Sequence, residues 1–213
     1  MKKITCVLCV LMCLAVLTAC GKPGKTGEMT GVIAIVVGEV MVNGKPAKVN
    51  DAVRFGDVVE TGKDSKVRIV IDGQNAIETW KDSTFVFKLR EGDGLIELKA
   101  GSMGAVMKNF SKVKEFRIST TTVAAGIRGT VLCINAESAD RTYACTCNGK
   151  IAFKAAGQGE ETVISAAHHK AATYERVGDK ITTKEAGMLY HTDEKMNDLA
   201  SGIGVKIDWG KAE

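Results

Sequence analysis

The side chains with the most reactive chemistry lie in the last third of this chain. Cys145 and Cys147 are separated by one residue, and the adjacent pair His168 and His169 follows further along. A Cys-x-Cys pair on a strand places both sulfur atoms on one face, because successive side chains alternate. For the same reason, only one of two adjacent histidines on a regular strand can join them. Two thiolates with imidazoles suit tetrahedral zinc, and thiolates also suit copper(I). A metal site at Cys145, Cys147, His168 and His169 is therefore one interpretation.

Two other interpretations of the same residues stay open. Cys133 lies on the strand before Cys145, across a loop at residues 137–141. A disulfide between them is favoured in an oxidising compartment, although cross-strand geometry often fails its distance requirement. The third interpretation is that the thiols are small buried groups and the histidines are surface residues.

Enzymatic chemistry has little support in the sequence. A nucleophile pair such as Cys147 with His169 is conceivable, but no oxyanion or orienting motif accompanies it. The chain has no phosphate-binding glycine loop, no GxSxG elbow and no HExxH pair. We therefore expect a protein that is not an enzyme.

Composition excludes several other classes of protein. The 213 residues are 45% hydrophobic and 25% charged, which is typical of a globular protein. Aromatic residues make up only 5%, too few for a surface that stacks on single-stranded nucleic acid. The net charge is +4, and Lys2 and Lys3 at the extreme N-terminus contribute two of those positives. So small a basic excess predicts no nucleic-acid partner.

The elements that must position these side chains are predicted to be strands. Hydrophobic residues alternate with polar ones in residues 67–71, 84–88 and 115–119, as on strands with one buried face. Turn-forming pairs recur between such runs, at residues 43–44, 61–62, 72–73, 93–94, 148–149 and 178–179. Residues 142–147 and 162–174 are predicted as further strands, the latter containing the histidine pair.

The predicted fold is all-β: a sandwich or roll, or a short β-solenoid, of many short antiparallel strands. Helical periodicity is clear only at residues 193–199, where Thr192 is a suitable N-cap and acidic residues follow it. One short C-terminal helix is expected there, ending before Gly202.

The N-terminus resembles the signal sequence of a bacterial lipoprotein. Lys2 and Lys3 precede an uncharged run over residues 4–17 that is too short to span a bilayer comfortably. The run ends Leu-Thr-Ala-Cys-Gly at residues 17–21, which is similar to a lipobox. The resemblance implies cleavage before Cys20, lipidation of its sulfur and membrane attachment outside the cytoplasm. A plain signal peptide or an uncleaved anchor helix are the alternatives.

Three stretches occur in order along the chain: residues 56–62 with the strand 67–71, residues 95–101, and residues 116–130. Together they resemble the extracytoplasmic domain of the FecR family. The last is the most specific: Arg128, Gly129 and Thr130 stand in the family's Val-Arg-Gly-Thr core, and Gly126 is among the small residues before it. Thr121 stands at a proline position of the family pattern, and Ile127 replaces the valine. We interpret Arg128 as a structural clamp whose guanidinium binds backbone carbonyls at a sharp bend, and a ligand site is the alternative.

The resemblance implies a β-rich domain that binds a partner or ligand outside the cytoplasm. Better-known family members control a cytoplasmic sigma factor through a cytoplasmic segment and a membrane helix ahead of this domain. Before Met29 this sequence has only the signal-like run and a small, polar tether, so we do not expect that direct control.

The expected organisation is a signal peptide over 1–19, a tether over 20–28, a FecR-like domain over 29–156 and a packed C-terminal extension over 157–213. The expected function is a lipid-anchored binding or scaffolding protein of the bacterial envelope, with a role in signalling or ligand sensing. Its partners would be the membrane, through the lipid, and an envelope protein. The alternative is a metal- or haem-handling lipoprotein that uses the Cys/His residues with zinc or copper.

Overall fold

The computed structural model of the protein describes residues 27–108 and 113–212. The predicted signal peptide and Cys20 lie outside these residues, and both stay predictions. Among the described residues, no helix has the length and hydrophobicity that crossing a bilayer requires.

Sixteen strands of the described residues form two layers, sheet A and sheet B, which share the two longest strands, β9 and β13. Sheet A runs in the order β3 (Lys45–Pro46), β2 (Val40–Val42), β5 (Val58–Thr61), β8 (Ser83–Arg90), β9 (Asp93–Met107), β10 (Phe116–Ser119), β11 (Val123–Ile127), β13 (Arg141–Ala155) and β14 (Glu161–Ala166). Sheet B runs in the order β4 (Ala52–Val53), β1 (Gly31–Val37), β6 (Lys66–Ile71), β7 (Asn75–Thr79), β9, β12 (Thr130–Ser138), β13, β15 (Lys170–Val177) and β16 (Lys180–Ala186).

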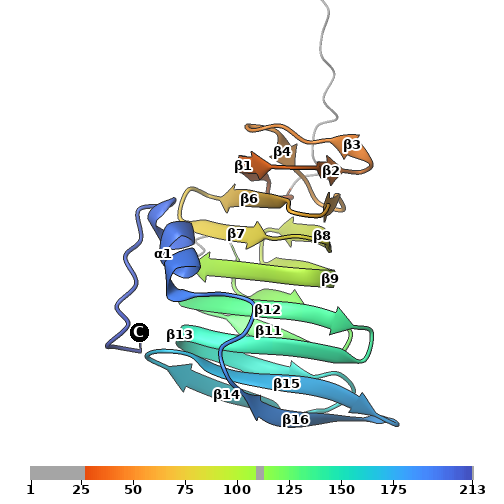
Figure 1. The fold of residues 1–213 in the computed structure, drawn as a ribbon, viewed down its shortest axis with the longest axis vertical. Helices are drawn as coiled ribbons and strands as arrows, with labels where there is room; N and C mark the ends of the chain where they lie inside the picture. Colours follow the sequence, from red (N-terminus) through yellow and green to blue (C-terminus); the bar gives the residue numbers. More distant parts are fainter. Residues whose placement is uncertain (1–26, 109–112, 213) are drawn as a thin grey trace, which may run out of the picture.

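The two shared strands join the layers. The first half of β9 pairs with β10 in sheet A, and its second half pairs with β12 in sheet B. The first half of β13 pairs with β12 in sheet B, and its second half pairs with β11 in sheet A. Because β10 pairs with β11, the strands β9, β10, β11, β13 and β12 form a closed hydrogen-bonded ring. Figure 1 shows β1 to β4 at one end of the molecule and β14 to β16 at the other.

The all-β prediction is confirmed, and the architecture is the sandwich or roll rather than a solenoid. Every pair of described strands is antiparallel except β9 with β10, whereas a solenoid stacks parallel coils. The alternating residues predicted to face inward are buried, among them Ile69, Phe87 and Ile118. They form the main core between the sheets, with residues from both layers.

Three local predictions were wrong. Asp93 and Gly94 do not make a turn, because they begin β9 and the turn after β8 lies at residues 91–92. Asn148 and Gly149 do not make a turn, because β13 continues through them to Ala155. Gly149 has a φ of +100°, and this left-handed backbone bends the strand from sheet B into sheet A instead of reversing it. Residues 162–174 are not one strand, because β14 ends at Ala166 and β15 begins at Lys170, with the histidine pair in the turn between them.

Helix α1 (Asp193–Ser201) confirms the predicted C-terminal helix and covers the outer face of sheet B (Figure 1). The side chain of Thr192 accepts a hydrogen bond from the Lys195 amide, which caps the first turn. Met196, Leu199 and Ala200 are buried in a second hydrophobic cluster, between the helix and the outer face of the sheet.

A buried ion pair under α1 fixes its position. Arg68 on β6 and Glu78 on β7 lie opposite each other on the outer face of sheet B, 2.7 Å apart. The same guanidinium reaches Asp198 of α1 at 2.5 Å, and the Trp80 indole donates to Glu78 at 2.9 Å. Because an unpaired buried charge is costly, these contacts hold the helix to the sheet.

Gly104 on β9 lies beneath the Met196 side chain of α1 and the Trp80 ring. A Cβ atom there would come within 2.8 Å of Met196 Cε and 2.9 Å of the Trp80 ring. We predict that Gly104→Val lowers the free energy of unfolding by about 1–3 kcal/mol through overpacking. The measurement is the urea midpoint, with Gly159→Val as control because that position faces open space. Equal midpoints for the two variants would contradict this packing of α1.

Candidate functional site

The three described cysteines lie in one patch on the outer face of sheet B. Cys133 comes from β12, and Cys145 and Cys147 come from one face of β13. All three are fully buried and are free thiols. Cys133 and Cys145 are direct cross-strand partners, as the disulfide interpretation required, but no disulfide joins them.

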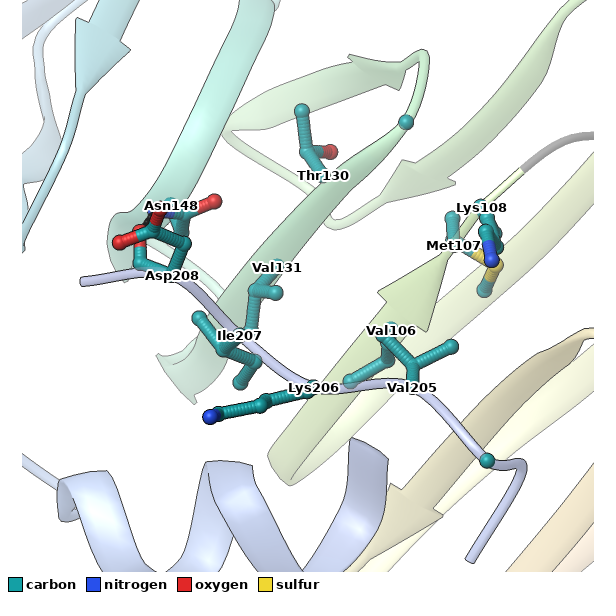
Figure 2. Close-up of a pocket in the computed structure, with 12 residues that line it drawn as sticks. Val106, Met107, Lys108, Thr130, Val131, Asn148, Val205, Lys206, Ile207 and Asp208 are labelled. Carbon is teal, nitrogen blue, oxygen red and sulfur yellow. Dashed lines mark hydrogen bonds between the residues drawn. The ribbon is translucent and has the colours of Figure 1, made fainter. Parts of the chain in front are cut away.

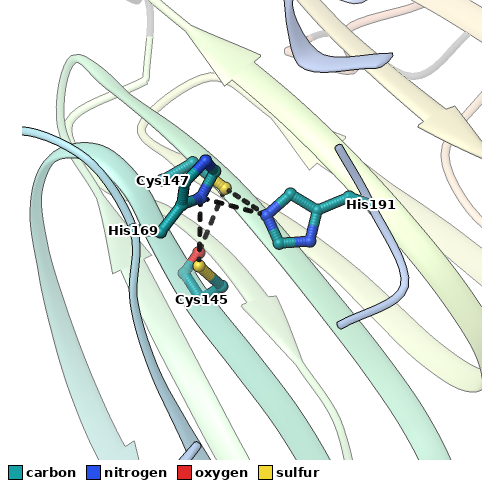
Figure 3. A group of neighbouring side chains, drawn as sticks. All are labelled: Cys145, Cys147, His169 and His191. Atoms are coloured by element: carbon teal, nitrogen blue, oxygen red, sulfur yellow. Dashed lines mark hydrogen bonds between the residues drawn. The ribbon is translucent and has the colours of Figure 1, made fainter. Parts of the chain in front are cut away.

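Two histidines from other segments meet Cys145 and Cys147. His169 lies in the turn between β14 and β15 with a φ of +40°, and its amide donates to the Cys147 carbonyl at 3.0 Å. His191 lies in the segment between β16 and α1 and is 5% exposed. Figure 3 shows the four side chains converging from these three segments.

The four donor atoms lie within 4.8 Å of one another. Cys145 Sγ is 3.6 Å from His169 Nδ1, and Cys147 Sγ is 3.2 Å from His191 Nε2. The two imidazole nitrogens, His169 Nδ1 and His191 Nε2, are 3.2 Å apart. We call Cys145, Cys147, His169 and His191 the Cys/His centre.

The outward-facing nitrogen of each imidazole is held by an oxygen atom. His191 Nδ1 is 2.6 Å from the Leu189 carbonyl, which can only accept a hydrogen bond. His169 Nε2 is 2.6 Å from Asp193 Oδ1. Each histidine therefore donates outward and turns its other nitrogen toward the sulfur atoms.

His168, also predicted as a ligand, is not part of this centre. Its side chain is 51% exposed, its Nε2 lies 2.9 Å from Asp193 Oδ2, and its ring is 5.1 Å from the Trp209 ring. The structure brings together three of the four residues predicted from the sequence and replaces His168 with His191. His191 is the third histidine of the chain, but no spacing pattern linked it to the cysteines.

Hydrogen bonds within the centre shift its protonation. The hydrogen bond from Cys147 is the main cause that lowers the pKa of Cys145 to about 3. Hydrogen bonds from the two imidazoles lower this pKa further, whereas burial raises it. Burial raises the pKa of Cys147 and of Cys133. Burial lowers the pKa of His169, but hydrogen bonds to Cys145 and Asp193 outweigh it and raise that pKa. The Cys145 sulfur is thus stabilised as a thiolate, the form that binds metals.

A second candidate site is a groove of about 560 Å³ on the outer face of sheet A. We call it the basic groove, because four cations line it against two carboxylates: Arg117, Arg128, Lys150 and Lys154, with Glu115 and Glu161. Arg117 is paired with Asp93 at 2.7 Å. The other three cations form no ion pair with any described residue. Sequence reasoning missed this groove, although Lys150 and Lys154 share one strand face.

The glycine–arginine motif lies where the chain passes from β11 in sheet A to β12 in sheet B. Gly126 lines the basic groove, Gly129 has a φ of +61°, and Thr130 begins β12. Arg128 is exposed, and its guanidinium bonds to no carbonyl of the described residues. The expected clamp is therefore absent there, and Arg128 contributes charge to the groove instead.

A smaller cavity of about 150 Å³ lies between the C-terminal segment and sheet B (Figure 2). Residues 204–208 cross over Val106, Thr130 and Val131 to form it. It has room for a few water molecules but not for a drug-sized ligand.

Comparison with known proteins identifies one family. A family model described as "FecR protein" matches residues 57–168, just over half of the chain. No curated protein sequence matches the chain significantly.

Two solved structures share the fold. They are crystal structures, at 1.65 Å and 2.50 Å, of a proposed anti-sigma factor from Parabacteroides distasonis ATCC 8503, with 8% and 9% sequence identity and a TM-score of 0.50. Each match covers 60% of this chain and 59% of the other, so the chain spans about three fifths of the length of those structures.

Asn148 fastens the C-terminal segment beside the small cavity. Its buried amide lies 2.8–2.9 Å from the carbonyls of Ala167, Asp208 and Lys211. We predict that Asn148→Ala makes tryptic cleavage after Lys206 about 5–30 times faster, because losing buried hydrogen bonds costs about 1–2 kcal/mol. Gln158→Ala is the control, since that amide bonds to Ile181 far from the segment. Unchanged cleavage in the Asn148 variant would contradict the prediction.

Proposed function

This chain belongs to the FecR family, and we propose that it is a lipid-anchored recognition protein of the bacterial envelope, with a regulatory rather than catalytic role. The observation that carries the proposal is the basic groove, because all of its lining residues fall inside the matched region 57–168. Its occupant would be an acidic segment of a protein partner.

Charge complementarity supports that occupant. Arg128, Lys150 and Lys154 have no partner carboxylate within ion-pair distance among the described residues, so an acidic segment would neutralise them. Two carboxylates in the groove make it less suited to a continuous polyanion such as nucleic acid.

The edge of sheet A offers a backbone contact beside the groove. β14 pairs only with β13 among the described strands, and Val163 on it is 65% exposed and lines the groove. An extended segment could add to this edge and lay its acidic side chains along the basic residues. The proposal is therefore recognition of an extended, acidic peptide.

A labelled oligoglutamate peptide tests the groove by fluorescence anisotropy. We predict that Lys150→Glu with Lys154→Glu weakens binding about tenfold, corresponding to 1.4 kcal/mol, and that salt weakens binding to the unmodified protein. The control is Lys180→Glu with Lys184→Glu, because these two lysines carry the same charge at exposed positions of β16 in sheet B. Equal losses in both double variants would mean non-specific attraction and overturn the groove assignment.

Lipid attachment is tested separately, in cells fed an alkyne fatty acid. The wild-type chain should become labelled, and Cys20→Ser should abolish the label because Cys20 supplies the sulfur that carries the lipid. Cys133→Ser should remain labelled, since that thiol is buried in the domain. Labelling of the Cys20 variant would contradict the anchor.

The alternative of a metal- or haem-handling protein has one observation in its favour, the Cys/His centre. Its donor atoms are enclosed, with Cys145 and Cys147 fully buried, whereas a transfer or haem site needs an open position. The enclosed centre therefore fits neither metal transfer nor haem binding.

A further inference from the structure

The inward-facing nitrogens of the Cys/His centre are placed to share one cation. His191 Nδ1 donates to the Leu189 carbonyl, and His169 Nε2 lies against Asp193, so both rings are held from outside. Their other nitrogens, His191 Nε2 and His169 Nδ1, lie 3.2 Å apart and each faces a cysteine sulfur. A bound cation would satisfy both nitrogens and both sulfur atoms at once.

Three separations between the donor atoms are close to the edges of a zinc tetrahedron. With Zn–N of about 2.0 Å and Zn–S of about 2.3 Å, ideal edges are about 3.3 Å for N–N and about 3.5 Å for S–N. The observed separations are 3.2 Å for N–N and 3.2 and 3.6 Å for two S–N contacts. The other three separations lie within 4.8 Å, so the side chains would close around a bound zinc ion.

Charge and burial also suit zinc. Two thiolates neutralise one Zn²⁺, so the complete centre carries no net charge where Cys145 and Cys147 are fully buried. The ligands would be two thiolates and two neutral imidazoles, so binding would release the protons that these groups carry without metal. Copper(I) with two thiolates would leave a net negative charge in the same surroundings.

We propose that Cys145, Cys147, His169 and His191 bind one Zn²⁺ as a closed structural site. The proposal is independent of the basic groove, which lies on the outer face of the other sheet. The site would join β13, the turn between β14 and β15, and the segment leading into α1. It would thereby fasten the segment between β16 and α1 across sheet B.

The neighbouring contacts show what the zinc would hold. Tyr143, Cys145 and Cys147 form a row on the outer face of β13. The Tyr143 hydroxyl donates to the Gly187 carbonyl at 3.2 Å and accepts from the Leu189 amide at 3.0 Å. The same short segment that carries His191 is thus already aligned along the row before metal binds.

Half of the ligands lie beyond the residues that match the family model. The match ends at residue 168, and His169 and His191 follow it. Asp193, the residue that orients His169, also lies beyond the match.

The test uses the full chain, purified in detergent after growth with added zinc. Elemental analysis should find about one zinc per chain. The double variant Cys145→Ser with Cys147→Ser and the single variant His191→Ala should each lose it. Cys133→Ser and His168→Ala are matched controls that should keep it, because neither residue belongs to the centre. Far-UV circular dichroism checks that every variant is folded.

Cobalt(II) substitution reports the ligand set directly. The wild-type chain should give the intense visible bands of tetrahedral cobalt and a thiolate-to-cobalt charge-transfer band. The charge-transfer band should vanish in the double serine variant, while Cys133→Ser should retain it.

Asp193 is a positioning residue, tested by Asp193→Asn. Loss of the carboxylate should weaken zinc affinity about 10–100-fold with the cobalt spectrum still tetrahedral. A merely structural role for Asp193 would lower thermal stability without changing affinity.

Fewer than about 0.1 zinc ions per wild-type chain would overturn the proposal. Zinc retained by the double serine variant would also overturn it. So would copper(I) bound in place of zinc after growth with both metals. Because oligoglutamate binding at the basic groove is measured separately, failure of zinc binding leaves the recognition proposal standing, and the reverse also holds.

Discussion

The architecture depends on two strands that belong to both sheets. A strand of 15 residues is long enough to pair in one layer, bend, and pair again in the other, and β9 and β13 both do so. Their crossings close the ring of five strands and lock the separation of the layers around the main core. Without them the two sheets would meet only through side-chain packing.

The crossing of β13 also decides which face each residue occupies. Before Gly149, the row Tyr143, Cys145 and Cys147 faces outward from sheet B and is covered by the C-terminal segment. After Gly149, Lys150 and Lys154 face outward from sheet A and line the basic groove. One strand therefore supplies both candidate sites, on opposite faces of the molecule, and the bend separates them.

The elements of the fold were largely predictable, because alternation of hydrophobic residues reports burial directly. Phe85, Phe87 and Ile118 are buried as their spacing indicated, and Thr192 caps the single helix. The Asn148–Gly149 pair led to a wrong turn prediction, because a residue with positive φ can bend a strand as well as reverse it in a turn. Nothing local distinguishes the two, since the choice depends on β11 and β14 being available to pair with the rest of the strand.

The candidate sites were only partly predictable for the same reason. Cys145 and Cys147 share a face by strand geometry alone, so that half of the centre followed from spacing. The choice of His169 over His168 depends on a left-handed turn, and the approach of His191 depends on Tyr143 holding a segment more than forty residues away in sequence. Such contacts are tertiary and leave no periodic signal.

The C-terminal segment has a physical reason to be fastened strongly. Sheet B presents Ala76, Val106 and Val131 on its outer face, which would be exposed without α1 and residues 203–209. The helix has only nine residues, too few to be stable on its own in water. It is held at one end by Arg68 and Asp198. A zinc ion bound by His191, two residues before its first turn, would secure the other end. The cover would then be fixed at both ends of a short helix, leaving the groove on sheet A as the face open to a partner.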